Sequence, residues 1–89
     1  METTQTRDTE RCRKRRGYAV AAITAEADRA CRKYAPFHSM HEGYAITMKE
    51  LDEAWADIKA NRPECVDEMI QVGAMALRFV AELVDWKDE

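Results

Sequence analysis

The sequence is poor in the residues that interrupt helices. Its 89 residues include only three glycines and two prolines, while Ala, Met and Leu are favoured over strand-forming residues. This composition predicts an all-α protein. A chain of this length forms one domain at most, and it often needs a partner chain to complete its core.

Disulfide frameworks, zinc motifs and membrane-length apolar runs are also missing. The three cysteines, Cys12, Cys31 and Cys65, are odd in number and widely spaced, and no Cys/His pair has zinc-site spacing. There is neither a signal peptide nor an apolar stretch long enough to span a bilayer. We therefore expect a cytoplasmic protein with reduced thiols and no membrane contact.

Charge is divided unevenly along the chain. Residues 1–35 carry nine Lys/Arg against five Asp/Glu, whereas residues 36–89 carry five against twelve. This asymmetry separates a basic N-terminal arm and helix, 1–35, from an acidic remainder, 36–89. The two parts belong to one domain.

A basic cluster lies within the arm, at Arg11, Arg13, Lys14, Arg15 and Arg16. It could grip phosphates, form a solvated helix start, or dock on the acidic remainder of the same or another chain. Only Tyr18 accompanies the cluster as an aromatic residue, and the whole protein is acidic. These features argue against a dedicated nucleic-acid binder.

Hydrophobic periodicity predicts a first helix from about Thr9 to Tyr34. Gly17 costs about 1 kcal/mol relative to Ala there, so the residues before it are expected to form a separate or looser turn. Pro36 ends the helix, because the residue before a proline is pushed out of helical geometry. The expected buried stripe consists of Ala19, Ile23, Ala27, Ala30 and Tyr34.

Two further helices are predicted in residues 36–89. A capping box, Ser39 to Glu42, starts the second helix near Met40, and it runs to about Ala60. Its apolar stripe is Tyr44, Met48, Leu51, Trp55 and Ile58. The third helix runs from about Pro63 to Trp86, with an apolar face that includes Val66, Met69, Ile70, Gly73, Leu77, Val80 and Val84. The second and third helices should form an antiparallel hairpin whose uncovered apolar face is completed as a helical bundle by oligomerisation.

Acidic residues border both apolar faces of this hairpin. Glu50, Glu53 and Asp57 form one strip at helical spacing, and Glu64, Glu68 and Gln71 form another. Carboxylates on two antiparallel helices can direct oxygen ligands into one cleft, which suits Mg²⁺. The alternative is a solvated acidic surface that binds no ligand.

The acidic residues also carry a resemblance to a known family. Lys49-Glu50-Leu51-Asp52-Glu53, followed by Glu68-Met69-Ile70-Gln71, resembles the E-E-x-x-E and E-x-x-D motifs of MazG-type all-α nucleoside triphosphate pyrophosphohydrolases. The surrounding sequence resembles the small MazG-like proteins of bacteriophages and prophages. The resemblance covers about residues 36–84. Lys49 stands where the family has its first Glu, and Gln71 where it has the final Asp.

The resemblance implies hydrolysis of a nucleoside triphosphate to the monophosphate and pyrophosphate with Mg²⁺, or with Mn²⁺ in its place, by a homodimer or homotetramer. The metal ligands would be Glu50, Glu53, Glu68 and Gln71. Glu53 and Asp57 would be catalytic, with Glu64 as an alternative to Asp57, and Arg78 and Lys49 would contact the phosphates. A rival register would use Glu64 and Asp67 as the second motif, but it leaves a shorter gap than the family has.

A second hypothesis follows from the two departures at Lys49 and Gln71. The chain could be a non-enzymatic descendant that keeps the helical scaffold and binds nucleotide or a host protein, having lost turnover. Trp55 is a candidate wall for base stacking, although its helical spacing equally suits packing.

Overall fold

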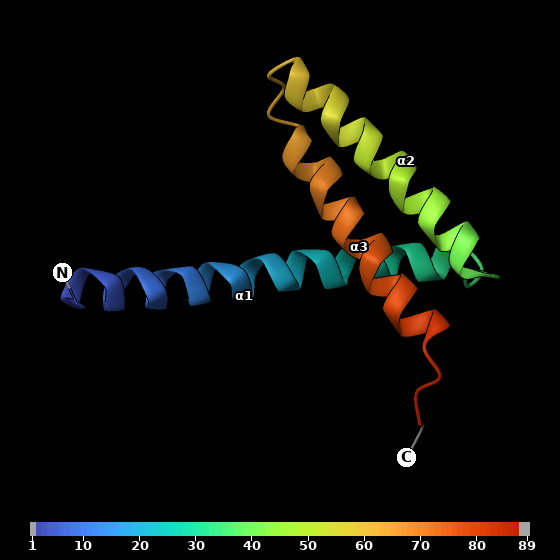
Figure 1. Ribbon diagram of the computed structural model, residues 1–89, viewed down its shortest axis with the longest axis horizontal. Coiled ribbons are helices and arrows are strands. Elements are labelled where there is room, and N and C mark those ends of the chain that lie inside the picture. Colours follow the sequence, from blue (N-terminus) through green and yellow to red (C-terminus); the bar gives the residue numbers. More distant parts are fainter. Residues whose placement is uncertain (1, 88–89) are drawn as a thin grey trace.

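The computed structural model describes residues 2–87, with side chains from residue 9 onward. The described chain consists of α1 (Glu2–Lys33), α2 (Met40–Lys59) and α3 (Cys65–Leu83), without strands. Helices α2 and α3 pack along each other as an antiparallel hairpin, and α1 packs on α3 (Figure 1). The predicted all-α hairpin architecture is confirmed.

Helix α1 is longer and more regular than predicted. It continues through Gly17 without interruption, so the expected break at this residue is wrong. An added Cβ at Gly17 would meet no atom of the described residues within 4 Å, so no close packing requires a glycine there. The N-terminal half of α1 extends away from the hairpin (Figure 1).

Helix α2 begins at the predicted capping box. The Ser39 hydroxyl accepts a hydrogen bond from the Glu42 amide at 3.1 Å. The Glu42 carboxylate accepts from the His38 amide at 2.7 Å, one residue earlier than the reciprocal bond that the motif predicts. The cap therefore orders the end of the linker between α1 and α2, residues 34–39, as well as the first turn of α2.

Helix α3 is shorter than predicted at both ends. Asn61 takes a left-handed conformation with φ of 56°, and Pro63 lies in the turn that follows rather than in the helix. Beyond the end of α3, the Trp86 indole donates a hydrogen bond to the Val80 carbonyl at 3.1 Å. Trp86 therefore contacts the last turns of α3 instead of belonging to the helix.

Four of the six buried apolar residues in the core are alanines. The six are Ala27, Ala30, Phe37, Ala54, Ala74 and Met75. Only Ala27 and Ala30 of the stripe predicted on α1 are buried, with Ile23 half-buried; the burial predicted for Ala19 and Tyr34 is wrong. Contact with α3 covers only the second half of α1, and every described side chain of residues 9–22 is exposed.

Four of the five large side chains in the apolar stripe predicted on α2 are exposed, and the fifth, Met48, is half-buried. Tyr44, Leu51, Trp55 and Ile58 are exposed, whereas Gly43 and Ala54 are buried. Small residues permit a close approach of two helices, which is why they take the inward positions.

Within the described residues, no helix is both long enough and apolar enough to cross a bilayer.

The close approach at Gly43 gives a test of this packing. A Cβ added there would lie 2.6 Å from Cδ2 of Phe79 and 3.1 Å from Cδ2 of Phe37. Overpacking of this kind costs about 1–3 kcal/mol, which exceeds the gain of up to about 1 kcal/mol from replacing a helical glycine. We expect Gly43→Ala to lower the melting temperature in calorimetry.

Gly17→Ala is the matched control, because its new Cβ meets nothing. It should raise the melting temperature, since it gains helix propensity alone. Equal behaviour of the two variants would contradict the close packing at Gly43.

Candidate metal centre between two helices

Three carboxylates predicted as metal ligands come together between α2 and α3. One carboxylate oxygen each from Glu50, Glu53 and Glu68 lie within 4.8 Å of one another. Two oxygens bound to one octahedral Mg²⁺ lie roughly 3–4 Å apart, because each bond is about 2.0–2.1 Å long. Small side-chain rotations would therefore bring these oxygens onto one cation.

Two of these carboxylates have an oxygen that is shielded from solvent and lacks a hydrogen-bond partner among the described residues. They are Oε2 of Glu50 and Oε2 of Glu68. An unsatisfied buried polar atom is rare and costs about 1–3 kcal/mol. A bound cation would provide the missing interaction for both oxygens, and the donor set of hard oxygens suits Mg²⁺ or Mn²⁺.

The pKa values of Glu50 and Glu68 also favour a bound cation. Burial raises the pKa of Glu50 above its ordinary value near 4.5, and the charges of Glu53 and Glu68 raise it further, while Lys49 lowers it. Burial also raises the pKa of Glu68, followed by the charges of Glu53, Asp57 and Asp67. Both carboxylates are therefore harder to ionise than an exposed glutamate. A cation bound between them would favour their ionised forms and lower both pKa values.

The other predicted site residues occupy different positions. Asp57 influences Glu68 electrostatically, but its carboxylate is held by Arg62 at 2.8 Å. Gln71 and Lys49 line an adjoining pocket. Glu64 is exposed at the start of α3 and makes no side-chain cap there.

The adjoining pocket lies between the end of α1, the linker, α2 and α3, and has a volume of about 490 Å³. Glu50 belongs both to this pocket and to the carboxylate group. Arg29 and Lys33 of α1 line it opposite Lys49 of α2. The pocket thus combines cationic side chains with one edge of an acidic site. Trp55, the candidate for base stacking, is not part of its lining.

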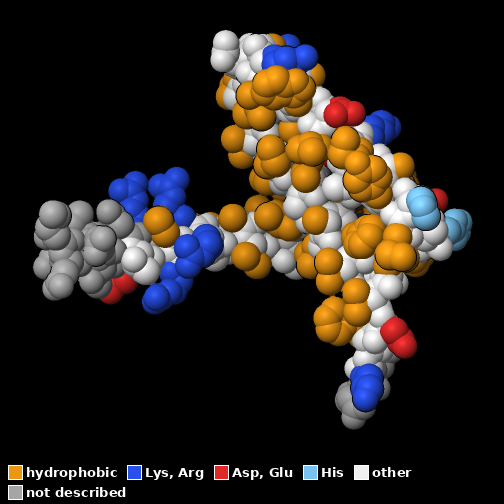
Figure 2. All heavy atoms as spheres, viewed as in Figure 1, with side chains coloured by type: hydrophobic (Ala, Val, Ile, Leu, Met, Phe, Trp, Pro, Cys, Tyr) orange, Lys and Arg blue, Asp and Glu red, His pale blue; other side chains and the backbone are white. Residues whose placement is uncertain are grey.

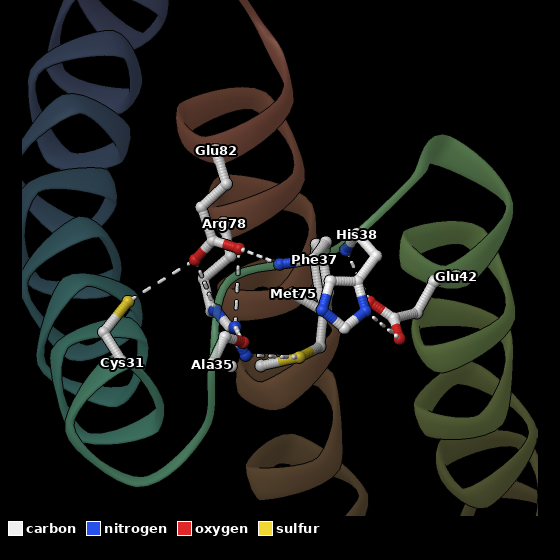
Figure 3. Close-up of polar contacts among 8 residues, drawn as sticks. All are labelled: Cys31, Ala35, Phe37, His38, Glu42, Met75, Arg78 and Glu82. Carbon is white, nitrogen blue, oxygen red and sulfur yellow. Dashed lines mark hydrogen bonds and ion pairs between the residues drawn. The ribbon is translucent and has the colours of Figure 1, made fainter.

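Arg78 has a structural role in the described chain, in contrast to the free phosphate clamp that the sequence predicts. Its side chain is 3% exposed, although it lies in the pocket lining. The guanidinium donates to Glu82 at 2.8 Å and to the Ala35 carbonyl at 3.0 Å, and it stacks over the Phe37 ring at 4.5 Å (Figure 3). These contacts join the linker to α3 and use the donors that a phosphate would need.

Glu82 completes this network, and sequence reasoning missed its role. Its carboxylate accepts hydrogen bonds from the Phe37 amide at 2.8 Å and from the Cys31 thiol at 3.6 Å, in addition to Arg78 (Figure 3). The one available signal was the i, i+4 spacing of Arg78 and Glu82 in the otherwise apolar second half of α3. Nothing in the sequence indicated the contacts with the linker or with α1.

Comparisons of the chain with protein-family models, with curated proteins and with solved structures find no match.

Loss of the Arg78 side chain should strongly destabilise the fold. We expect Arg78→Met to lower the free energy of unfolding at neutral pH by about 3 kcal/mol, because it leaves the Glu82 charge shielded and unpaired. The double variant Arg78→Met with Glu82→Gln should recover part of this loss. Chemical denaturation of both variants checks the prediction, and an unchanged single variant would contradict it.

The effect of Arg78→Met should depend on pH. Burial opposes ionisation of Glu82, but hydrogen bonds from Arg78 and the Phe37 amide outweigh it and hold the pKa of Glu82 below its ordinary value. A depressed acid pKa stabilises the fold above the unfolded-state pKa, and this contribution is lost as pH falls through the folded-state pKa. The difference between wild type and variant should therefore narrow in strong acid.

Removing one charge from the carboxylate group should stabilise the fold, in contrast to the loss of Arg78. Because the pKa of Glu68 is raised, its ionisation opposes folding at neutral pH, and this penalty disappears as pH falls through the folded-state pKa. Without divalent metal, Glu68→Gln should raise the melting temperature by a few degrees at neutral pH, with a smaller difference in mild acid.

Saturating Mg²⁺ should then raise the melting temperature of the wild type more than that of Glu68→Gln. Asp52→Asn is the control, since Asp52 is an exposed acid on α2 outside the carboxylate group. If Asp52→Asn and Glu68→Gln respond identically to pH and Mg²⁺, the acidic group is an ordinary solvated surface.

Proposed function

We propose that the protein hydrolyses a nucleoside triphosphate to the monophosphate and pyrophosphate with the help of Mg²⁺. The observation that carries this proposal is the meeting of Glu50, Glu53 and Glu68 beside a pocket whose mixed lining includes cationic side chains. The resemblance of the same residues to the MazG-type motif supports it, and the two shielded oxygens without partners favour a cation over a solvated surface.

Glu50, Glu53 and Glu68 would hold the metal. When bound, Mg²⁺ would neutralise phosphate charge and polarise the phosphorus for attack by water. Gln71 is neutral, so it is the weakest of the predicted ligands for a hard cation. Three carboxylates are enough for this role, because Mg²⁺ commonly uses one or two together with waters and phosphate oxygens.

The pocket suits the remainder of the substrate. Its volume of about 490 Å³ lies within the usual range for small-molecule sites. Lys49 forms no ion pair among the described residues, which leaves its ammonium group available for a phosphate oxygen. Arg29 is bonded to Glu26 at 2.7 Å, so it would have to exchange that partner to reach a phosphate.

In the proposed reaction, water adds to the α phosphorus, the bond to the bridging oxygen breaks, and pyrophosphate leaves. The proton of the attacking water passes to a nearby carboxylate. Glu53 suits this task because it is the exposed member of the carboxylate group. Asp57 is less suited, since its carboxylate is already engaged by Arg62.

The proposal predicts Mg²⁺-dependent release of pyrophosphate from at least one ribo- or deoxynucleoside triphosphate. Glu53→Gln should reduce the rate at least 100-fold, because it removes both a ligand and the proton acceptor. Asp52→Asn, one residue away and outside the group, should keep the wild-type rate. Circular dichroism of both variants checks that the helices are retained.

Retained turnover in Glu53→Gln would contradict the assignment of the site. Absence of pyrophosphate release from every triphosphate, with Mg²⁺ and with Mn²⁺, would contradict the enzymatic function and favour the scaffold hypothesis. Under that hypothesis the chain binds nucleotide or a host protein without turnover.

A further inference from the structure

The first half of α1 is an exposed basic helix. We define the basic segment as residues 10–22, in which every side chain is exposed. It contains five Lys/Arg residues against one acid, Glu10. The next residue, Ile23, is half-buried and lies against Gly73 of α3, so the packed part of α1 begins there. The basic segment extends away from the hairpin (Figure 1).

The five cations of the basic segment have no acidic partner among the described residues. They are Arg11, Arg13, Lys14, Arg15 and Arg16, and none of them belongs to an ion pair there. Figure 2 shows Lys and Arg side chains on more than one side of this helix. Like charges three or four residues apart on a helix destabilise it. An anionic partner would relieve this repulsion and support the helix.

The uninterrupted course of α1 through Gly17 places an aromatic residue beside the cations. Arg11, Lys14, Arg15 and Tyr18 occupy positions i, i+3, i+4 and i+7, which share one face of a helix. Tyr18 is 64% exposed, and a tyrosine hydroxyl can donate to a phosphate oxygen next to Lys and Arg contacts. A break at Gly17, expected from the sequence, would have separated the tyrosine from the cluster.

The acidity of the remaining chain does not keep an anion away from the basic segment. At 1.5 Å per residue, the cations lie roughly 10–18 Å beyond Ile23 along the helix axis. The Debye length at physiological ionic strength is about 8 Å, so the acids of residues 36–89 are largely screened at that distance. The formal net charge of −3 for the whole chain therefore does not describe the field at this helix.

The distribution of the cations favours a groove over a flat surface. At about 100° per residue, Arg13 and Arg16 lie on the side of the helix opposite the Tyr18 face. A bilayer would contact one side only, and a helix that lies in a bilayer needs a broad apolar face. The basic segment lacks such a face, because its two large apolar residues, Tyr18 and Val20, lie on opposite sides.

Double-stranded DNA offers a groove of suitable dimensions and charge. The major groove of B-form DNA is about 12 Å wide and admits an α-helix, with phosphates along both of its edges. The major groove of double-stranded RNA is deep and narrow. A helix with cations on opposite sides therefore fits the DNA groove better.

We propose that the basic segment of α1 binds in the major groove of double-stranded DNA, with its cations contacting phosphates at both edges of the groove. Phosphate contacts supply the affinity, so binding depends little on base sequence and has a dissociation constant of roughly 10⁻⁴–10⁻⁶ M at physiological salt. The inference depends neither on the carboxylate group nor on turnover.

The first experiment measures binding of the full chain to a fluorescein-labelled DNA duplex by fluorescence anisotropy at increasing salt. Neutralisation of four or five phosphates should give a plot of log K against log[NaCl] with a slope of roughly −3.6 to −4.5. Absence of binding at low salt, or a salt-independent affinity, would overturn the proposal. Equal affinity for phosphatidylserine vesicles, or higher affinity for an RNA duplex or single-stranded DNA of the same length, would overturn it as well.

Two matched pairs of variants locate the contact. Arg15→Gln should reduce the magnitude of the salt slope by about 0.9, because it removes one phosphate contact. Arg32→Gln is its control, since Arg32 is an exposed arginine of α1 outside the basic segment and should leave the slope unchanged. Equal slopes for these two variants would overturn the assignment to the basic segment.

Tyr18→Phe should weaken binding about 3-fold without changing the salt slope, because it removes an uncharged hydrogen-bond donor. Tyr44→Phe is the control, since Tyr44 is also 64% exposed but lies on α2. Circular dichroism of all four variants checks that the helices are retained. Equal affinities of the two tyrosine variants would overturn the role given to the Tyr18 face.

Discussion

Helices α2 and α3 approach each other where one of them has almost no side chain. Gly43 lies against Phe79, and Ala54 is completely shielded from solvent. Contact on small residues brings the two backbones close together, and the side chains next to the contact line must then share a narrow space. The positions of the carboxylates, the exposure of the large apolar residues and the shape of the pocket all follow from this close approach.

The carboxylate group is one consequence. Glu50 and Glu68 lie on facing helices, and burial together with the charges of Glu53 and Glu68 raises the pKa of Glu50. Such an arrangement lowers the stability of the metal-free fold. Sites of this kind are common where a protein gives up stability for function, since a bound cation would convert the repulsion into attraction.

The sequence predicted those parts of the structure that depend on local patterns. The Ser39–Glu42 cap and the start of α2 follow from hydrogen bonding within four residues. The meeting of Glu50, Glu53 and Glu68 follows from helical spacing and an antiparallel hairpin. In both cases the decisive residues are close in sequence or are related by a simple turn.

Features that depend on contacts between distant segments could not be predicted in this way. Leu51 and Ala54 both fit an apolar stripe on α2, and only the approach of α3 decides that the alanine turns inward. Arg78 has the residue type and spacing of a phosphate ligand, but the linker folds back onto it and uses its donors. The MazG-like pattern carries no information about this linker contact, because it describes the acidic positions alone.

The Glu82 carboxylate joins three segments of the chain at one point: the end of α1 through Cys31, the linker through Phe37, and α3 through Arg78. The linker wall of the pocket is therefore held in one position before any ligand arrives. A ligand that fits against this wall need not spend binding energy on ordering it. The exposed side chains of Arg29 and Lys33 on α1 can change rotamer to fit ligands of different size. The pocket therefore has one rigid wall and one adaptable wall.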